Sequence, residues 1–142
     1  MTIAGLYRKM EALNTEKVIT DAFDETLPDL VNINRERMTD GVRADGSIMP
    51  FYSKTSQAVF GYPNTPIKLK ATGAFQAAIE VKRSGNVLTT DSTDEKNGML
   101  EGRYGKEIFG TGGSYKKQYI DENLGVAFRK NITTTTGLKF GR

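Results

Sequence analysis

The sequence predicts a small α+β domain in which a small antiparallel sheet, formed by a hairpin, packs against one or two helices. Residues 77–83 alternate apolar and polar side chains, which would place Ala77, Ile79 and Val81 on one face of a strand. Residues 84–91 then supply a Ser-Gly-Asn turn and a second strand-forming run. This alternation is typical of a half-buried hairpin, which needs helices to cover its apolar face.

An apolar stripe over residues 15–38 predicts the helix that covers the sheet. Asn14 or Thr15 can cap its start, and Pro28 interrupts it. Thr26 could cap a second helix, so the pattern predicts either one long kinked helix or two helices in series. The stripe in the first half of this segment consists of Val18, Ile19, Ala22, Phe23 and Leu27.

Three other helices are expected. Residues 2–12 and 94–104 have the composition of short helices, and Ser114 can cap a longer one near the C-terminal end. Gly125 weakens the last turns of that helix. Residues 111–113 before it, Thr-Gly-Gly, are expected to form a flexible joint.

Thr72 and Gly73 are expected to form a structural turn. They follow the apolar lead-in 66–69 and precede the first strand. We expect Gly73 to adopt a backbone conformation that residues with a Cβ disfavour, because the lead-in must turn sharply into the strand.

The expected organisation is a single domain over residues 1–132, with a long loop at 41–66 and a C-terminal arm at 133–142. Loops of this length without secondary structure are often functional. The aromatic content of the loop argues against plain disorder. For each single aromatic, packing within the chain and contact with a neighbour are equally good interpretations, but for the whole loop we favour contact with another subunit. The candidate interface residues are Phe51, Tyr52, Phe60, Tyr62, Leu138 and Phe140.

Composition narrows the functional classes. The 142 residues include no cysteine and no histidine. The commonest general base, the commonest zinc ligand and the thiol nucleophile are therefore missing. No apolar stretch approaches the length of a membrane span, and the first residues lack the order of a signal peptide. We therefore expect no enzyme, no cofactor, no metal and no membrane partner, with synthesis in the cytoplasm.

The sequence matches neither a phosphate-binding loop nor a calcium-binding loop. Residues 110–117 are rich in glycine but lack the spacing of a phosphate-binding loop. Residues 40–46 place Val42 and Ala44 where a calcium loop needs ligands. The acidic residues 91–95 are explained more simply as charge at a helix N-terminus.

Charge is distributed unevenly along the chain. Residues 1–50 hold nine acidic and six basic side chains, whereas residues 51–142 hold eight acidic and fourteen basic ones. The ordinary interpretation is a solvated surface, and the alternative is a small basic module that binds DNA without sequence preference. The candidate DNA-facing residues are Lys116, Lys117, Arg129 and Lys130.

The order of motifs resembles a family of phage proteins. Residues 46–55, Gly-Ser-Ile-Met-Pro-Phe-Tyr-Ser-Lys-Thr, are similar to a Gly-x-x-(Trp/Met)-x-Pro-(Leu/Tyr)-Ser-x-x-Thr stretch in virion-morphogenesis proteins of tailed bacteriophages. Residues 67–75 resemble the Leu-x-x-Thr-Gly-x-(Leu/Phe) element that follows in that family, and the resemblance covers about residues 15–110. The chain departs from the family at residues 98–100, where a Tyr-Ala pair is common, and in its Thr-rich tail.

The resemblance implies a structural role. Members of this group are tail-completion or head–tail joining proteins with an α+β fold. They assemble as rings in the neck or tail, around the DNA channel. For this chain the resemblance implies a homo-oligomeric ring of six or twelve copies, contact with portal, connector or tail proteins, and non-specific DNA passing through the channel. The implied location is the virion, assembled in the host cytoplasm.

Overall fold

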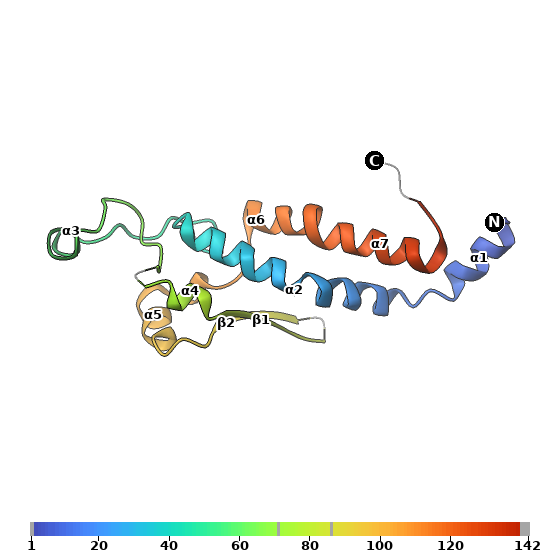
Figure 1. Ribbon diagram of the computed structural model, residues 1–142, viewed down its shortest axis with the longest axis horizontal. Helices are drawn as coiled ribbons and strands as arrows, with labels where there is room; N and C mark the ends of the chain where they lie inside the picture. Colours follow the sequence, from blue (N-terminus) through green and yellow to red (C-terminus); the bar gives the residue numbers. More distant parts are fainter. Residues whose placement is uncertain (1, 71, 86, 140–142) are drawn as a thin grey trace.

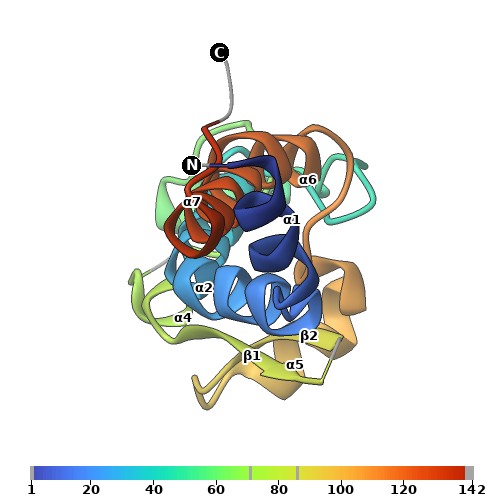
Figure 2. The same cartoon turned by 90° about the vertical axis from the view of Figure 1, so that its right-hand side faces the viewer.

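The computed structural model describes residues 2–70, 72–85 and 87–139. The molecule is elongated along one long helix, α2 (Thr15–Thr39). Figure 2 shows α2 between helix α7 (Gly125–Thr136) on one side and the hairpin of β1 (Ile79–Ser84) and β2 (Val87–Ser92) on the other. The predicted α+β class, with an antiparallel hairpin packed on helices, is confirmed.

Helix α2 is one continuous helix, which decides between the two predicted alternatives. The Asn14 side chain caps it by accepting from the Lys17 N–H at 3.0 Å. Pro28 lies inside the helix, and Thr26 is not a second cap. Instead, the buried Thr26 hydroxyl bonds the Ala22 carbonyl at 2.7 Å and lies 2.8 Å from the Tyr119 hydroxyl. Thr26 therefore joins α2 to the C-terminal helices.

The hairpin presents Ile79 and Val81 to the interior, as the alternation predicts. The prediction that Ala77 belongs to the same strand face is wrong, because Ala77 ends the short helix α4 (Ala74–Ala77) and is exposed. Arg35 explains why a helical turn is stable there. Its guanidinium donates to the carbonyls of Gln76 and Ala77 at 2.7 and 2.9 Å, which satisfies acceptors at the end of α4.

Gly73 precedes α4 with φ +80° and ψ −11°, so the predicted left-handed conformation is confirmed. The turn leads into α4 rather than directly into the strand. The Thr72 hydroxyl accepts from the Ala74 N–H at 3.4 Å. Together these two residues redirect the chain between the lead-in and the helix.

The C-terminal helix has an irregular middle. Helix α6 (Gly113–Gln118) runs into a π-helical segment, η2 (Tyr119–Leu124), and then into α7. The residue at the N-cap position is Gly112, not Ser114 as predicted, because Ser114 already lies inside α6. The helix continues through Gly125, where its geometry changes from π-helical to α-helical.

Residues 133–136 are the last turn of α7, which corrects the expected start of the C-terminal arm at 133. The reason is burial of Thr136, whose hydroxyl donates to the Ile132 carbonyl at 2.7 Å. Gly137 ends the helix with φ +76°. Only residues 137–139 of the expected arm extend beyond the helix within the described part of the chain.

The predicted loop 41–66, called the arm from here on, contains a helix, α3 (Lys54–Phe60), which composition alone did not reveal. Ser53 caps α3 by accepting from the Ser56 N–H, and Gly61 ends it with φ +69°. The two flanks of this arm are tied by a single antiparallel bridge between Phe51 and Pro66. The remaining elements are α1 (Ile3–Glu11), α5 (Asn97–Tyr104) and the 3₁₀ turn η1 (Lys106–Ile108).

Two apolar clusters form the core, and each contains residues of both α2 and β1. One is built around Met38, Phe75, Ile79 and Ile108, and the other around Leu30, Ile33, Val81 and Tyr119. Within the described residues, no helix combines the length and the hydrophobicity needed to cross a bilayer.

A buried arginine lies beside these clusters. Arg37 is 1% exposed, and its guanidinium donates to the carbonyls of Val42, Ile108 and Gly110 at 2.6, 2.5 and 3.1 Å. The fully buried Asn34 accepts from Arg37 at 3.3 Å and from the Gly110 N–H at 3.1 Å. Residues 110–111 are therefore anchored to α2, and the expected flexible joint is held in place.

Replacing Gly73 by Val should destabilise the domain. A Cβ at Gly73 meets no atom within 4 Å, so the cost arises from the left-handed backbone and is roughly 1–2 kcal/mol or more for a β-branched residue. Gly102, which is helical and equally open, is the matched control, and Gly102→Val should change stability by less than about 0.5 kcal/mol. Urea unfolding measures both. Equal effects of the two substitutions would contradict the strain.

Replacing Arg37 by Met should lower the free energy of unfolding by about 3 kcal/mol or more, because one buried and two partly buried carbonyls lose their donor. Arg103→Met, at an exposed arginine, should change it by less than about 0.5 kcal/mol. Chemical denaturation compares the two variants. A stable Arg37→Met variant would show that the carbonyls find other donors.

Candidate functional site

A cleft of about 580 Å³ opens where the arm joins the body. Its walls come from residues 50–62 of the arm, from the turn at residues 67–73, and from α5 with the loop before it. A volume of this size is typical of ligand and side-chain binding sites. These three segments are distant in sequence, and the core cluster around Phe75 brings them together.

Aromatic side chains build the arm side of the cleft. The rings of Tyr52 and Tyr62 stack with centroids 4.5 Å apart, which closes the arm on itself. The Tyr52 hydroxyl also accepts from the Lys68 N–H at 3.4 Å. Phe51 lies next to this stack and is 56% exposed, so its ring is available to a partner.

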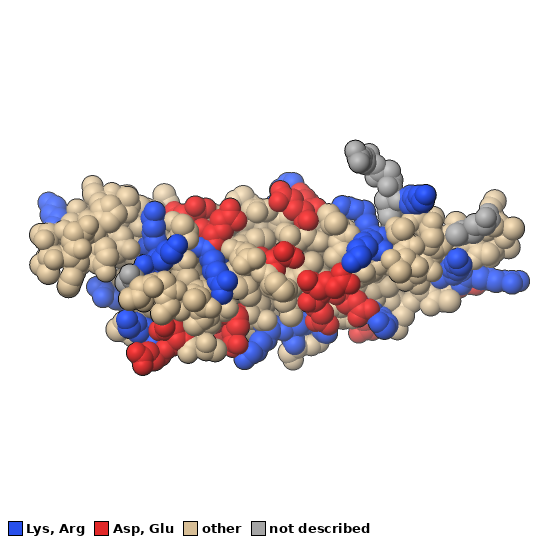
Figure 3. All heavy atoms as spheres, viewed as in Figure 1, with Lys and Arg blue, Asp and Glu red and all other residues tan. Residues whose placement is uncertain are grey.

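The cleft carries positive charge. Three cationic side chains, those of Lys70, Lys96 and Arg103, line it together with one carboxylate, that of Asp94. The Arg103 guanidinium lies 5.5 Å from the centroid of the Tyr104 ring. Figure 3 shows a group of Lys and Arg side chains near the junction of arm and body, whereas the end of the arm is largely uncharged on this face. The cleft is therefore suited to a group that is both acidic and apolar.

The backbone beneath the cleft is strained. Leu69 has φ +51°, the only positive φ of a non-glycine residue in the described part of the chain, and Gly73 also lines the cleft. A left-handed conformation costs an L-residue roughly 1–2 kcal/mol. Such strain clusters at functional sites, which makes the turn at residues 67–73 part of the candidate site.

The predicted interface residues separate into three groups. Phe51, Tyr52 and Tyr62 line the cleft. Phe60 lies outside it on α3, 70% exposed and 5.9 Å from the Tyr62 ring. Leu138 is half-buried after α7, and Phe140 lies outside the described residues.

The cationic residues of the cleft were missed. Lys96 lies just before α5 and Arg103 lies on it. Both are about 30 to 40 positions after the arm in the sequence, and nothing in the residues around them links them to it. The turn residues Thr72 and Gly73 were identified for their conformation alone. Their position in the cleft follows from the packing.

The four predicted DNA-facing residues lie on the C-terminal helix, two on α6 and two on α7. Lys117 forms an ion pair with Asp121, and this hydrogen bond raises the pKa of Lys117. Lys130 lies 3.9 Å from Glu25 of α2. Two of the four cations thus already have carboxylate neighbours, which any phosphate group must displace. Lys116 and Arg129 are exposed.

A second, more apolar cavity of about 440 Å³ lies between β2 and the C-terminal helix. It is lined by Phe23, Leu88, Phe109 and Ile120, among others, with Lys116 at its polar side. Beside it, Tyr115 donates to Asp40 at 2.6 Å. Burial, followed by this hydrogen bond, raises the pKa of Tyr115 to about 12.

In the described part of the chain, no three acidic side chains come close enough together to hold a metal ion. Comparison with protein-family models, with curated proteins and with solved structures finds no match to this chain.

Tyr62→Ala should loosen the arm without unfolding the body. Loss of the Tyr52–Tyr62 stack, worth about 0.5–1.5 kcal/mol, should raise amide hydrogen exchange over residues 53–65 by roughly threefold to tenfold. Exchange in α2 should stay unchanged. Val59→Ala, at an exposed position of α3, is the control and should leave the arm's exchange unaltered.

Proposed function

We propose that this chain is a structural subunit of the neck or tail of a tailed bacteriophage particle, where copies form a ring around the DNA channel. The motif order at residues 46–55 and 67–75 supports the class of role. The part played by the chain is assembly through the arm, and the proposal assigns it no catalytic chemistry.

The main structural support for this proposal is the exposed apolar surface of the arm. Helix α3 and its flanks project from one end of the elongated body (Figure 1) and expose large apolar side chains. The exposed set is Ile48, Phe51, Val59 and Phe60. Exposed apolar groups gathered on one projecting segment are typical of a protein–protein contact.

The other end of the molecule supports the same role. Helix α1 lies at the end opposite the arm and packs against α7, with Ile3, Tyr7 and Met10 exposed along one side. A ring subunit needs two different surfaces, because a heterologous contact closes a ring when the rotation between copies permits it. Two unlike apolar ends meet this requirement.

Replacing Phe51 and Phe60 together by Ser should weaken assembly by roughly thirtyfold or more, as expected for central aromatic contacts. The isolated chain should keep its melting temperature, because both rings are largely exposed. Native mass spectrometry of the chain with its particle components measures the assembly, and Val87→Ser is the exposed control. Assembly that is unaffected by the double substitution would remove the arm from the interface.

The ring itself is tested by electron microscopy of purified particles. A ring of defined copy number containing this chain is the expected result. A single copy per particle would overturn the proposed function.

A further inference from the structure

We propose that the basic cleft of one copy receives an acidic and apolar patch on the C-terminal helix of the next copy. The patch consists of Asp121, Glu122 and Val126. This inference rests on the proposed function, because it names the contact that would repeat around the ring.

The cleft selects for carboxylates next to an apolar side chain. Its three cations outnumber its one carboxylate, and most of its uncharged lining residues are aromatic or aliphatic. Single-stranded nucleic acid fits less well, because stacking of bases needs free ring faces. Tyr52 and Tyr62 cover each other, and Phe75 is buried. Tyr104, the fifth aromatic residue of the lining, is half-buried and lies beside Arg103, so Phe51 alone offers a largely exposed ring, which favours a protein segment.

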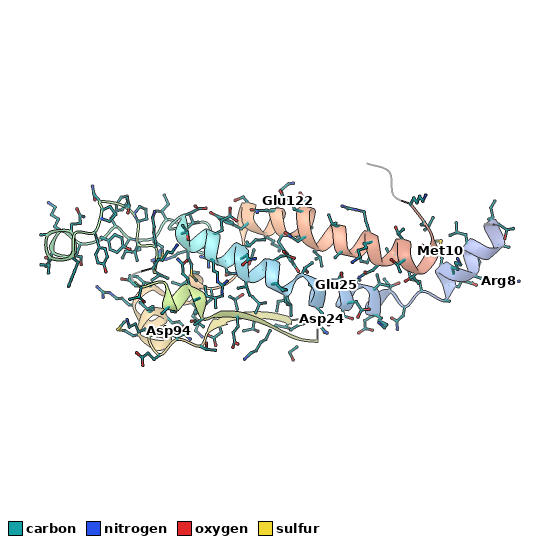
Figure 4. The ribbon with its side chains drawn as sticks, in the orientation of Figure 1. Arg8, Met10, Asp24, Glu25, Asp94 and Glu122 are labelled. Atoms are coloured by element: carbon teal, nitrogen blue, oxygen red, sulfur yellow. The ribbon has the colours of Figure 1, made fainter. Side chains whose placement is uncertain are left out.

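The patch supplies the matching chemistry. Val126 is 49% exposed, and the carboxylates of Glu122 and Asp121 are exposed near it, although Asp121 is already paired with Lys117 of its own helix. Glu122 and Val126 are four residues apart and so lie on neighbouring turns of one helix face. Figure 4 shows Glu122 on the outer side of the helix, directed away from α2. Among the described cations, none lies within ion-pair distance of Glu122.

The π-helical segment η2 carries both carboxylates of the patch. Tyr119 points into the core and bonds Thr26 at 2.8 Å, which fixes the start of η2. Ile120 lines the cavity between β2 and this helix, so the patch begins at Asp121. Short π-helical segments of this kind occur frequently at functional sites.

The two surfaces cannot meet within one chain. In both Figure 1 and Figure 2, α5 and α6 lie on opposite sides of α2. Helix α5 borders the cleft, and α6 leads into the segment that carries the patch. The rigid helix α2 keeps them apart. Contact between cleft and patch is therefore heterologous, and each copy offers one of each surface to its two neighbours.

The absence of cysteine from the sequence permits a direct test by cross-linking of the full chain. Met99→Cys places a thiol in the cleft and Val126→Cys places one on the patch, and neither changes the charge. Differently tagged copies of the two variants are mixed and treated with a short bismaleimide. Val87→Cys, at a similarly exposed valine outside the patch, replaces Val126→Cys as the control.

The expected result is a covalent heterodimer with a yield about tenfold above that of the Val87→Cys control. Adding Arg103→Glu to the cleft copy should lower the yield to the control value, because like charges then face each other. Adding Glu122→Lys to the patch copy should restore it. The inference is overturned if the yield equals that of the control, or if neither charge reversal changes the yield.

These outcomes are distinguishable from failure of the proposed function. A ring seen in purified particles together with a control-level cross-link yield leaves the function standing and removes the cleft–patch contact. A single copy per particle removes the ring, whatever the cross-linking of the purified chain shows.

Discussion

The structure depends on one buried guanidinium. Arg37 is almost completely buried, and its guanidinium donates to the carbonyls of Val42, Ile108 and Gly110 and to the Asn34 amide oxygen. Burial lowers the pKa of Arg37 to about 10, so the group stays charged at neutral pH. A buried charge is tolerated only when its donors are satisfied. The three carbonyls that satisfy it must therefore keep their positions relative to α2.

This constraint positions the base of the arm. Val42, which begins the arm, and the loop at residues 108–110 are both bonded to Arg37, and the Ala44 N–H donates to the Glu107 carbonyl at 2.7 Å. Gly112 passes so close to Ala44 that a Cβ would lie 2.1 Å from its carbonyl oxygen. The base of the arm is thus clamped between α2 and the loop before α6. The distal part, with α3, is held mainly by the Phe51–Pro66 bridge and the tyrosine stack.

A rigid base with a projecting, apolar tip suits a subunit that assembles. The body needs only a thin core, because α2 contributes to both apolar clusters and shares one of them with the hairpin and the C-terminal helix. The remaining apolar side chains are distributed to the ends and to the outer face of the C-terminal helix. Such a distribution leaves several different apolar surfaces exposed to neighbouring subunits, whereas a compact domain of the same size would bury more of its apolar side chains.

Several elements could be predicted from the sequence because their causes are local. The alternation of apolar residues determined the hairpin, the apolar stripe and the Asn14 cap determined α2, and the Gly73 turn required a residue without a Cβ. Each of these depends on side chains within a few positions of one another. The aromatic arm was also identified as a feature, although its helix α3 was not.

Only the tertiary structure decided the rest. We attribute the continuation of α2 through Pro28 to Thr26, which is buried and bonded to the distant Tyr119, and the helical conformation of residues 133–136 to the burial of Thr136. The cleft brings Lys96 and Arg103 to an arm that lies over 30 positions away, because the cluster around Phe75 packs all three segments together. Local patterns specify which elements form. Burial between distant segments specifies where they meet, and the candidate site exists only where they do.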